Sequence, residues 1–303
     1  MPTVAILLPV FNGQDYIKQC ITSLLEQTFK DFELIVINDG SVDNTMEQVY
    51  FFDDPRIKVI HLDRNSGTAH ALNQGWAASD SRYVALMDHD DIALPVRLEH
   101  QVRTLNAQPR IVIAGSQMRT FGFTEANVHV PQHDGGIKAN LISGTNNILN
   151  PTAMIRRQAV DKMNVQWKND MRGIFDWVFW CDLMLHRAPF INLPDILLKY
   201  RVHESQQSRD QRNLRSLQAQ TRQKLLINLF PYLTPEEVIT VEPMLQWVHP
   251  PGIERQDLIY GLQILKGMIK QSASLYGEDR DMLNIYLRKC HHRWVNALIS
   301  YSQ

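Results

Sequence analysis

The stretch Tyr83-Val84-Ala85-Leu86-Met87-Asp88-His89-Asp90-Asp91 decides how this chain folds. Its first five residues form an apolar run, which is typical of a strand buried on both faces of a sheet. Three carboxylates and an imidazole follow directly, and a helical pattern begins at Pro95. Clustered carboxylates repel one another and lose hydration when buried, and a divalent cation with a bound diphosphate would compensate for both effects. The alternative is a solvated acidic turn that caps the next helix.

Composition excludes several classes of protein. Of the 303 residues, 44% are apolar and 21% are charged, as in ordinary globular domains. The formal net charge of -1 leaves no excess of lysine and arginine for a phosphate backbone, so no nucleic-acid partner is expected. Three scattered cysteines predict neither a disulfide framework nor a cysteine-rich zinc site, which fits the cytoplasm. The apolar run at residues 4–8 is too short for a signal peptide, and no stretch approaches the ~20 apolar residues of a membrane span.

The first half of the chain alternates strand-like and helix-like patterns. Strands are expected at residues 4–8, 32–37, 57–60 and 83–87. Helices are expected at residues 14–27, from a cap at Ser41 or Asp43 through Tyr50, at 68–78 and at 95–108. This alternation predicts an α/β fold with a parallel, doubly wound sheet, because each helical crossover returns the chain to a neighbouring parallel strand.

The pattern changes after about residue 110. Extended segments are expected at residues 111–118, 151–156 and 196–203, a loop at 129–136, and a buried helix at 175–186. From about residue 208 the chain is amphipathic, and helices are expected at 209–229, 235–248, 253–276 and 281–300. We therefore predict an α/β domain at residues 1–208 and a helical C-terminal region at 209–303.

Four polar loops follow the four predicted strands of the first half. They are residues 9–12, 38–41, 63–67 and 88–91. In a doubly wound sheet such loops meet at one edge and form a ligand crevice. The glycines do not match GxGxxG, and GxxxxGK[ST] is absent, which disfavours a classical dinucleotide site and a P-loop. The remaining kind of nucleotide site is one in which carboxylates recognise the nucleotide and a metal holds its phosphates.

Short segments in a fixed order carry a family resemblance. They are Pro9-Val10-Phe11-Asn12, Val36-Ile37-Asn38-Asp39-Gly40-Ser41, Asn65-Ser66-Gly67, Ala71-Leu72-Asn73, Met87-Asp88-His89-Asp90-Asp91, Leu94-Pro95-Val96-Arg97-Leu98, Pro151-Thr152-Ala153-Met154-Ile155-Arg156-Arg157 and Tyr200-Arg201-Val202-His203. Over about residues 3–208 this series resembles the family 2 glycosyltransferases, which are inverting and nucleotide-sugar dependent. The resemblance implies a GT-A fold, a Rossmann-like and mostly parallel sheet flanked by helices, with the helical C-terminal region as an appendage outside it.

The resemblance implies a donor site formed by the strand-end loops. Asp39 corresponds to the carboxylate that accepts the uracil imide N–H, and the backbone near Pro9 and Val10 lies against the base. The other donor-nucleotide candidates are Asn12, Asn65, Gly67, Asn73 and Asp88. From the residues alone, Asp39 can also be a turn former, while Asn65 and Asn73 can act in helix capping or loop bonding.

The resemblance also implies a divalent cation, Mn²⁺ or Mg²⁺, at Asp88, Asp90 and His203. Asp88 and Asp90 match the two acids of the DxD motif, with Asp90 in direct contact with the metal and Asp88 in contact with ribose or with the metal through water. His203 matches a late histidine that completes the metal or diphosphate site, and its alternative is a surface residue without a ligand. Such a metal neutralises the charge that grows on a departing diphosphate.

The candidate catalytic base is Asp176. The family carries a Glu-Asp pair at the start of the predicted buried helix, where this chain has Phe175-Asp176-Trp177-Val178-Phe179-Trp180. Phe175 replaces the usual Glu and Val178 replaces a later acid, so impaired activity is an open alternative. Asp176 can instead be the N-cap of the helix, and Asp170 is the reserve candidate. Three tryptophans nearby can form a sugar platform or belong to the core, namely Trp167, Trp177 and Trp180.

The function implied is inverting transfer of a sugar from a UDP-sugar to a hydroxyl of a glycan or lipid-linked acceptor, in surface polysaccharide biosynthesis. One alternative is a catalytically impaired nucleotide-sugar-binding scaffold whose helical region binds a partner. A nucleotidyltransferase is a third reading, disfavoured because a glycine-rich triphosphate loop is absent. We expect a cytoplasmic protein. The helical region leaves open packing on the α/β domain, homodimerisation, or peripheral contact with the inner face of the plasma membrane.

Overall fold

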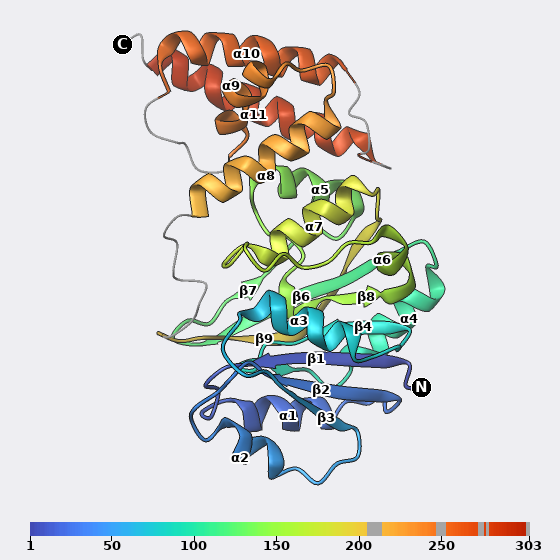
Figure 1. Ribbon diagram of the computed structural model, residues 1–303. Helices are drawn as coiled ribbons and strands as arrows, with labels where there is room; N and C mark the ends of the chain where they lie inside the picture. The colour runs from blue at the N-terminus through green and yellow to red at the C-terminus, as the bar shows by residue number, and fades with distance from the viewer. Residues whose placement is uncertain (205–213, 247–252, 272–275, 277–278, 301–303) are drawn as a thin grey trace. The chain divides into compact units, whose positions relative to one another are not determined.

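The computed structural model describes residues 1–204, 214–246, 253–271, 276 and 279–300 (Figure 1). The chain divides into two compact units. Unit 1 contains residues 1–132, 148–179 and 189–210, and unit 2 contains residues 133–147, 180–188 and 211–303. The chain passes for the last time from unit 1 to unit 2 after residue 210, and the domain division at residue 208 stays a prediction. The sequence pattern did not indicate that residues 133–147 and 180–188 also belong to the helical unit.

Four parallel strands form one half of the sheet in unit 1, as predicted. They are β1 (Val4–Val10), β2 (Phe32–Asn38), β3 (Ile57–His61) and β4 (Tyr83–Leu86). Their order is β3-β2-β1-β4, so the chain passes to the other side of β1 after β3. This reversal makes the carboxyl ends of β1 and β4 a topological switch point, the position at which doubly wound sheets bind their ligands.

The other half of the sheet is mixed. Its strands are β5 (Ile92–Ala93), β6 (Ile113–Gly122), β7 (Asn127–Val128), β8 (Met154–Arg156) and β9 (Phe190–Val202). β8 runs antiparallel between β4 and β6, β9 runs parallel to β6, and β5 pairs antiparallel with β9. The strand predicted at 196–203 begins earlier, at Phe190. The extended segment predicted at 151–156 divides into a 3-10 turn, η1 (Asn150–Thr152), and β8.

Helices cover both faces of the parallel half (Figure 1). The helices of unit 1 are α1 (Ile17–Leu25), α2 (Thr45–Tyr50), α3 (Thr68–Ala77), α4 (Arg97–Ala107), α6 (Arg157–Met163), which the sequence pattern did not predict, and the first residues of α7 (Phe175–Leu185). Alternate residues of β1 share a core with α1 and α4. On the opposite face, a Cβ on Gly75 of α3 would lie 3.0 Å from Leu7 and 2.9 Å from Ile37. This two-sided burial explains the continuous apolar run of β1, in which each large side chain contributes about 1.5–3 kcal/mol.

The regular secondary structure described in unit 2 is all helical. It contains α5 (Asp134–Ser143), the rest of α7, α8 (Leu214–Leu229), α9 (Pro235–Val241), η3 (Glu242–Leu245), α10 (Arg255–Lys270) and α11 (Arg280–Ser300). The helix predicted at 235–248 changes to 3-10 geometry after Val241, beside Pro243, and residues 247–248 lie outside the described part. The predicted residues 209–213 and 272–275 are also outside it. None of the described helices combines the length and apolarity needed to span a bilayer.

Candidate active site

The acidic segment after β4 forms a tight turn at the switch point. Met87 N donates to Leu7 O at 3.1 Å, which continues the pairing of β4 with β1, and Asp91 N donates to Asp88 O at 3.3 Å. Asp91 is fully buried, whereas Asp88 is half-buried. Burial, followed by the charges of Asp90 and Asp176, raises the pKa of Asp88 to about 7. The sequence therefore places several carboxylates where their negative charges are only partly compensated.

A buried arginine supports the turn from below. Arg97 is 1% exposed, and its Nη2 donates to Leu86 O at 2.7 Å, the last residue of β4. Burial lowers the pKa of Arg97 to about 10, and Asp91 and Asp88 oppose that shift. The guanidinium stays charged at neutral pH and partly offsets the acidic cluster. One oxygen of Asp91, Oδ2, still has no hydrogen-bond partner among the described residues.

Asp90 and His203, which the family resemblance implied as two metal ligands, lie in contact. His203 follows the end of β9, and its Nε2 lies 2.9 Å from Asp90 Oδ2. The two side chains are 13% and 14% exposed. The His203 ring also contacts the ring of Tyr16, with centroids 4.9 Å apart. His203 is thus held against the acidic turn and is not an isolated surface residue.

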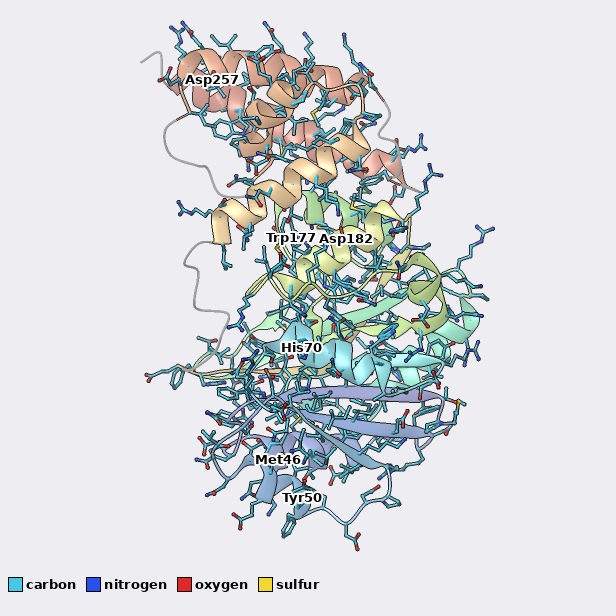
Figure 2. The ribbon with its side chains drawn as sticks, in the orientation of Figure 1. Met46, Tyr50, His70, Trp177, Asp182 and Asp257 are labelled. Atoms are coloured by element: carbon cyan, nitrogen blue, oxygen red, sulfur yellow. The ribbon has the colours of Figure 1, made fainter. Side chains whose placement is uncertain are left out.

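Asp176 also reaches this cluster. It lies in the first turn of α7, the helix that carries Trp177 in Figure 2, and its charge is close enough to raise the pKa of Asp88. Asp176 Oδ1 accepts the N–H of Trp177 at 2.7 Å. Asn150, the first residue of η1, approaches from another side, and its Nδ2 lies 3.5 Å from Asp88 Oδ1. Because α7 begins at Phe175, Asp176 is a first-turn residue, and the predicted N-cap alternative does not describe it.

Asp39 organises the loop that leads into α3. Its two carboxylate oxygens accept the backbone N–H groups of Ser66 and Gly67, each at 2.8 Å, and its own N–H donates to Val10 O at 2.9 Å. Gly67 has φ +94°, a conformation that residues with a Cβ rarely adopt. Each oxygen of Asp39 keeps a second lone pair after these bonds. The carboxylate can therefore hold the loop and also accept one more N–H.

Most other predicted donor-side residues link loops to one another. Pro9 and Val10 are buried at the end of β1. Asn12 has a φ of 52°. Its Oδ1 accepts the backbone N–H of Val42 at 2.9 Å, and its own N–H donates to Ser41 Oγ at 3.0 Å. These two bonds join the loops after β1 and β2.

Asn73 and the tryptophans hold the loop between α6 and α7. Asn73 Nδ2 donates to Trp167 O at 2.8 Å, whereas Asn65 is exposed. The Trp167 ring stacks on Phe179 of α7, with centroids 4.4 Å apart and planes at 16°. Trp167, Trp177 and Trp180 are at most 3% exposed. They are core residues, the first of the two alternatives that the sequence left open, and their burial argues against the sugar platform.

Arg172 was missed by the sequence analysis. It is exposed on the loop before α7, and a Cβ on Gly67 would lie 3.5 Å from its Nε. Its guanidinium therefore lies over the start of α3, which carries His70 in Figure 2. Arg172 makes no hydrogen bond or ion pair with any residue in the described ranges. Periodicity gives no signal for an irregular loop, so only the fold could bring this cation to the donor side.

The acidic cluster fits a cation that is completed by a substrate. In the described part of the chain, no three His, Cys, Asp or Glu side chains are arranged to hold a metal by themselves. Mg²⁺ and similar hard cations are instead held by one or two carboxylates together with substrate phosphates. Asp88, whose pKa is raised, and the Asp90–His203 pair together offer such a partial ligand set.

Comparison with known proteins identifies the family. The model of Glycosyl transferase family 2 matches residues 5–164, more than half of the chain. The chain belongs to this family. An uncharacterized glycosyltransferase of Haemophilus influenzae is 31% identical over 219 residues, which cover 68% of each protein. The putative teichuronic acid biosynthesis glycosyltransferase TuaG of Bacillus subtilis is 27% identical over 209 residues, which cover 66% of this chain and 79% of TuaG.

A solved structure shows the fold of this glycosyltransferase. S. aureus TarS 1-349 in complex with UDP-GlcNAc matches with a TM-score of 0.66 and 16% identity, covering 99% of this chain and 91% of that one. The match to a longer TarS chain covers 54% of that longer chain. The likeness confirms the predicted GT-A fold with C-terminal helices. The family prediction is also confirmed, whereas the roles of individual residues stay predictions.

Proposed function

We propose that this glycosyltransferase moves a sugar from a UDP-sugar to a hydroxyl of a glycan or lipid-linked acceptor, with inversion, in surface polysaccharide biosynthesis. The observation that carries the proposal is the convergence of Asp176 and the Asp90–His203 pair on Asp88 at the switch point. The UDP-GlcNAc bound by TarS supports a uridine donor, and the name of TuaG supports the pathway.

Asp39 is the proposed uracil acceptor. Asp39 is 4% exposed and its carboxylate accepts two backbone N–H groups, so the remaining lone pairs point in set directions. A carboxylate accepts from the uracil imide but not from the unprotonated ring nitrogen of cytosine, which favours uridine nucleotides. Arg172, over Gly67, would add a cation for the phosphates.

Asp88, Asp90 and His203 are the proposed residues for Mn²⁺ or Mg²⁺. When bound, the metal stabilises the negative charge that develops on the departing diphosphate. Asp90 and His203 are already in contact, so this part of the site needs little rearrangement. Asp88 must be ionised to take part, and a nearby cation would lower its raised pKa.

Asp176 is the proposed base. As the acceptor oxygen bonds to the anomeric carbon, the bond from that carbon to the diphosphate oxygen breaks, and the acceptor proton passes to the Asp176 carboxylate. Asp176 lies near the start of α7, where the helix dipole favours the anion and weakens the base. The neighbouring charge of Asp88 opposes that effect. The preceding residue is Phe175, which is half-buried, so Asp176 is the acidic residue in the first turn of α7.

Release of UDP from a panel of UDP-sugars with Mn²⁺ tests the proposal. We expect release above background, its loss in Asp90→Ala, and a loss in Asp176→Asn that leaves UDP binding intact. Asp257→Ala is the matched control, because Asp257 is an exposed acid on α10 (Figure 2). Tight UDP binding without turnover of any donor would favour a scaffold. Pyrophosphate release from a nucleoside triphosphate would favour a nucleotidyltransferase.

A further inference from the structure

Arg201 donates hydrogen bonds to the acidic turn from two separate atoms. It lies near the end of β9, and its backbone N–H donates to Asp91 Oδ1 at 2.8 Å. Its side-chain Nε donates to Asp90 O, also at 2.8 Å. The main chain and the side chain of one residue therefore fix two consecutive acids. The pairing of β9 with β5 directly after the turn keeps this strand alongside it.

The guanidinium of Arg201 contacts two aromatic rings. Its Cζ lies 4.5 Å from the ring centroid of Tyr16 and 4.4 Å from that of Phe121. Its Nη2 donates to Gln19 Oε1 at 2.6 Å. Two cation–π contacts and two side-chain hydrogen bonds leave the group little freedom. This arrangement depends on a planar fork, which a lysine does not provide.

The same assembly orients His203. The Tyr16 ring contacts both Arg201 and His203, and His203 Nε2 lies 2.9 Å from Asp90 Oδ2. Asp90 is thus held at its carbonyl by Arg201 and at its carboxylate by His203. If the Arg201 contact were lost, the Asp90 backbone could rotate, and the distance between the carboxylate and the imidazole would no longer be fixed.

We propose that Arg201 is a positioning residue that fixes Asp90 and His203 in the arrangement that binds a divalent cation with UDP. The inference rests on the proposed function, because it assumes that this pair meets the metal. Arg201 acts through Asp90 and the Tyr16 ring. Partners that orient metal ligands in this way typically change metal affinity by about 10–100-fold when they are removed.

Calorimetric titration of UDP with and without Mn²⁺, and of uridine alone, tests the proposal. In Arg201→Ala we expect Mn²⁺-dependent UDP binding to weaken about tenfold or more, with uridine binding unchanged. Arg201→Lys keeps the charge but loses the fork, so it should weaken binding in the same direction. Arg103→Ala is the control, because it removes an exposed arginine on α4 that takes no part in this assembly and should leave metal-dependent binding unchanged.

Tyr16 supplies a second pair of variants in case Arg201→Ala does not fold. Tyr16→Phe keeps the ring and should bind as wild type does, whereas Tyr16→Leu should weaken Mn²⁺-dependent binding. Unchanged Mn²⁺ dependence in folded Arg201 and Tyr16→Leu variants would overturn the proposal, and so would an equal loss of uridine binding. If wild type binds neither UDP nor Mn²⁺, the proposed function fails, and this inference fails with it.

Discussion

The imidazole of His203 lies 2.9 Å from the carboxylate of Asp90, although 113 residues separate them in the chain. The two meet because β9 runs beside the segment that follows the acidic turn. Both side chains are largely buried. A carboxylate and an imidazole in contact at a sheet edge can bind a metal ion together or share a proton. The acids around them add oxygen ligands, which favours the metal ion.

Replacement of His203 should therefore weaken metal-dependent binding. In His203→Ala we expect the Mn²⁺ concentration for half-maximal UDP binding to rise at least about tenfold. Calorimetry with UDP over a Mn²⁺ series measures this shift. His186→Ala, which removes an exposed histidine, is the control. An unchanged Mn²⁺ series in His203→Ala would show that the contact with Asp90 is structural only.

Asp39 should affect both stability and nucleotide binding. Asp39→Ala removes the acceptor of two backbone N–H groups, and hydrogen bonds to a charged group contribute about 1.5–3 kcal/mol each. We expect the free energy of unfolding to fall by about 3 kcal/mol or more in urea denaturation. Asp39→Asn retains one acceptor oxygen, so it should lose less stability and still bind uridine poorly. Normal uridine binding by Asp39→Asn would refute the uracil contact.

Arg172 should distinguish phosphate from base recognition. The guanidinium is exposed over Gly67 and has no partner among the described residues, so it can bind a donor phosphate. In Arg172→Ala we expect UDP affinity to fall about tenfold, which corresponds to about 1.4 kcal/mol, with uridine affinity unchanged. Arg103→Ala on α4 removes another exposed arginine and is the control. Equal UDP affinities for Arg172→Ala and Arg103→Ala would exclude this role.

The raised pKa of Asp88 predicts a pH dependence of stability without metal. The folded pKa is about 7, above the ordinary value of 3.8, so the folded state binds more protons between these values. Stability therefore falls as pH rises through this window. Asp88→Asn removes the charge, so we expect it to melt above wild type at pH 8 and close to it at pH 5. Thermal melts across this range, in chelator, provide the measurement, and a constant difference at all pH values would contradict the assignment.

Much of unit 1 could be predicted from the sequence because its strands are buried on both faces. The apolar runs of β1 and β4, and the run at residues 34–37 of β2, are typical of strands buried on both faces, and polar loops follow them. The family resemblance was the basis for expecting Asp90 and His203 to lie close together. Composition and spacing alone left that histidine open, since nothing local relates it to the acidic turn.

The predictions that failed depend on contacts between distant segments. Residues 129–136 were expected to be a loop, yet α5 begins at Asp134 in spite of Gly135 and Gly136, which disfavour helices. The Tyr276 hydroxyl donates to Gly135 O at 2.6 Å, and a Cβ on Gly135 would lie 2.6 Å from Asp279 O. Glycine thus permits a close approach that no local pattern reveals. Arg201 was noted only as part of a motif, because its partners come from three separate parts of the chain.

The most direct test is the anomalous scattering of manganese in a crystal of the protein soaked with UDP and Mn²⁺. The account predicts a manganese peak within coordination distance of Asp90, with His203 and the diphosphate beside it and the uracil against Asp39. A nucleotide bound away from the carboxyl ends of β1 and β4, or a manganese peak away from the acidic turn, would contradict it.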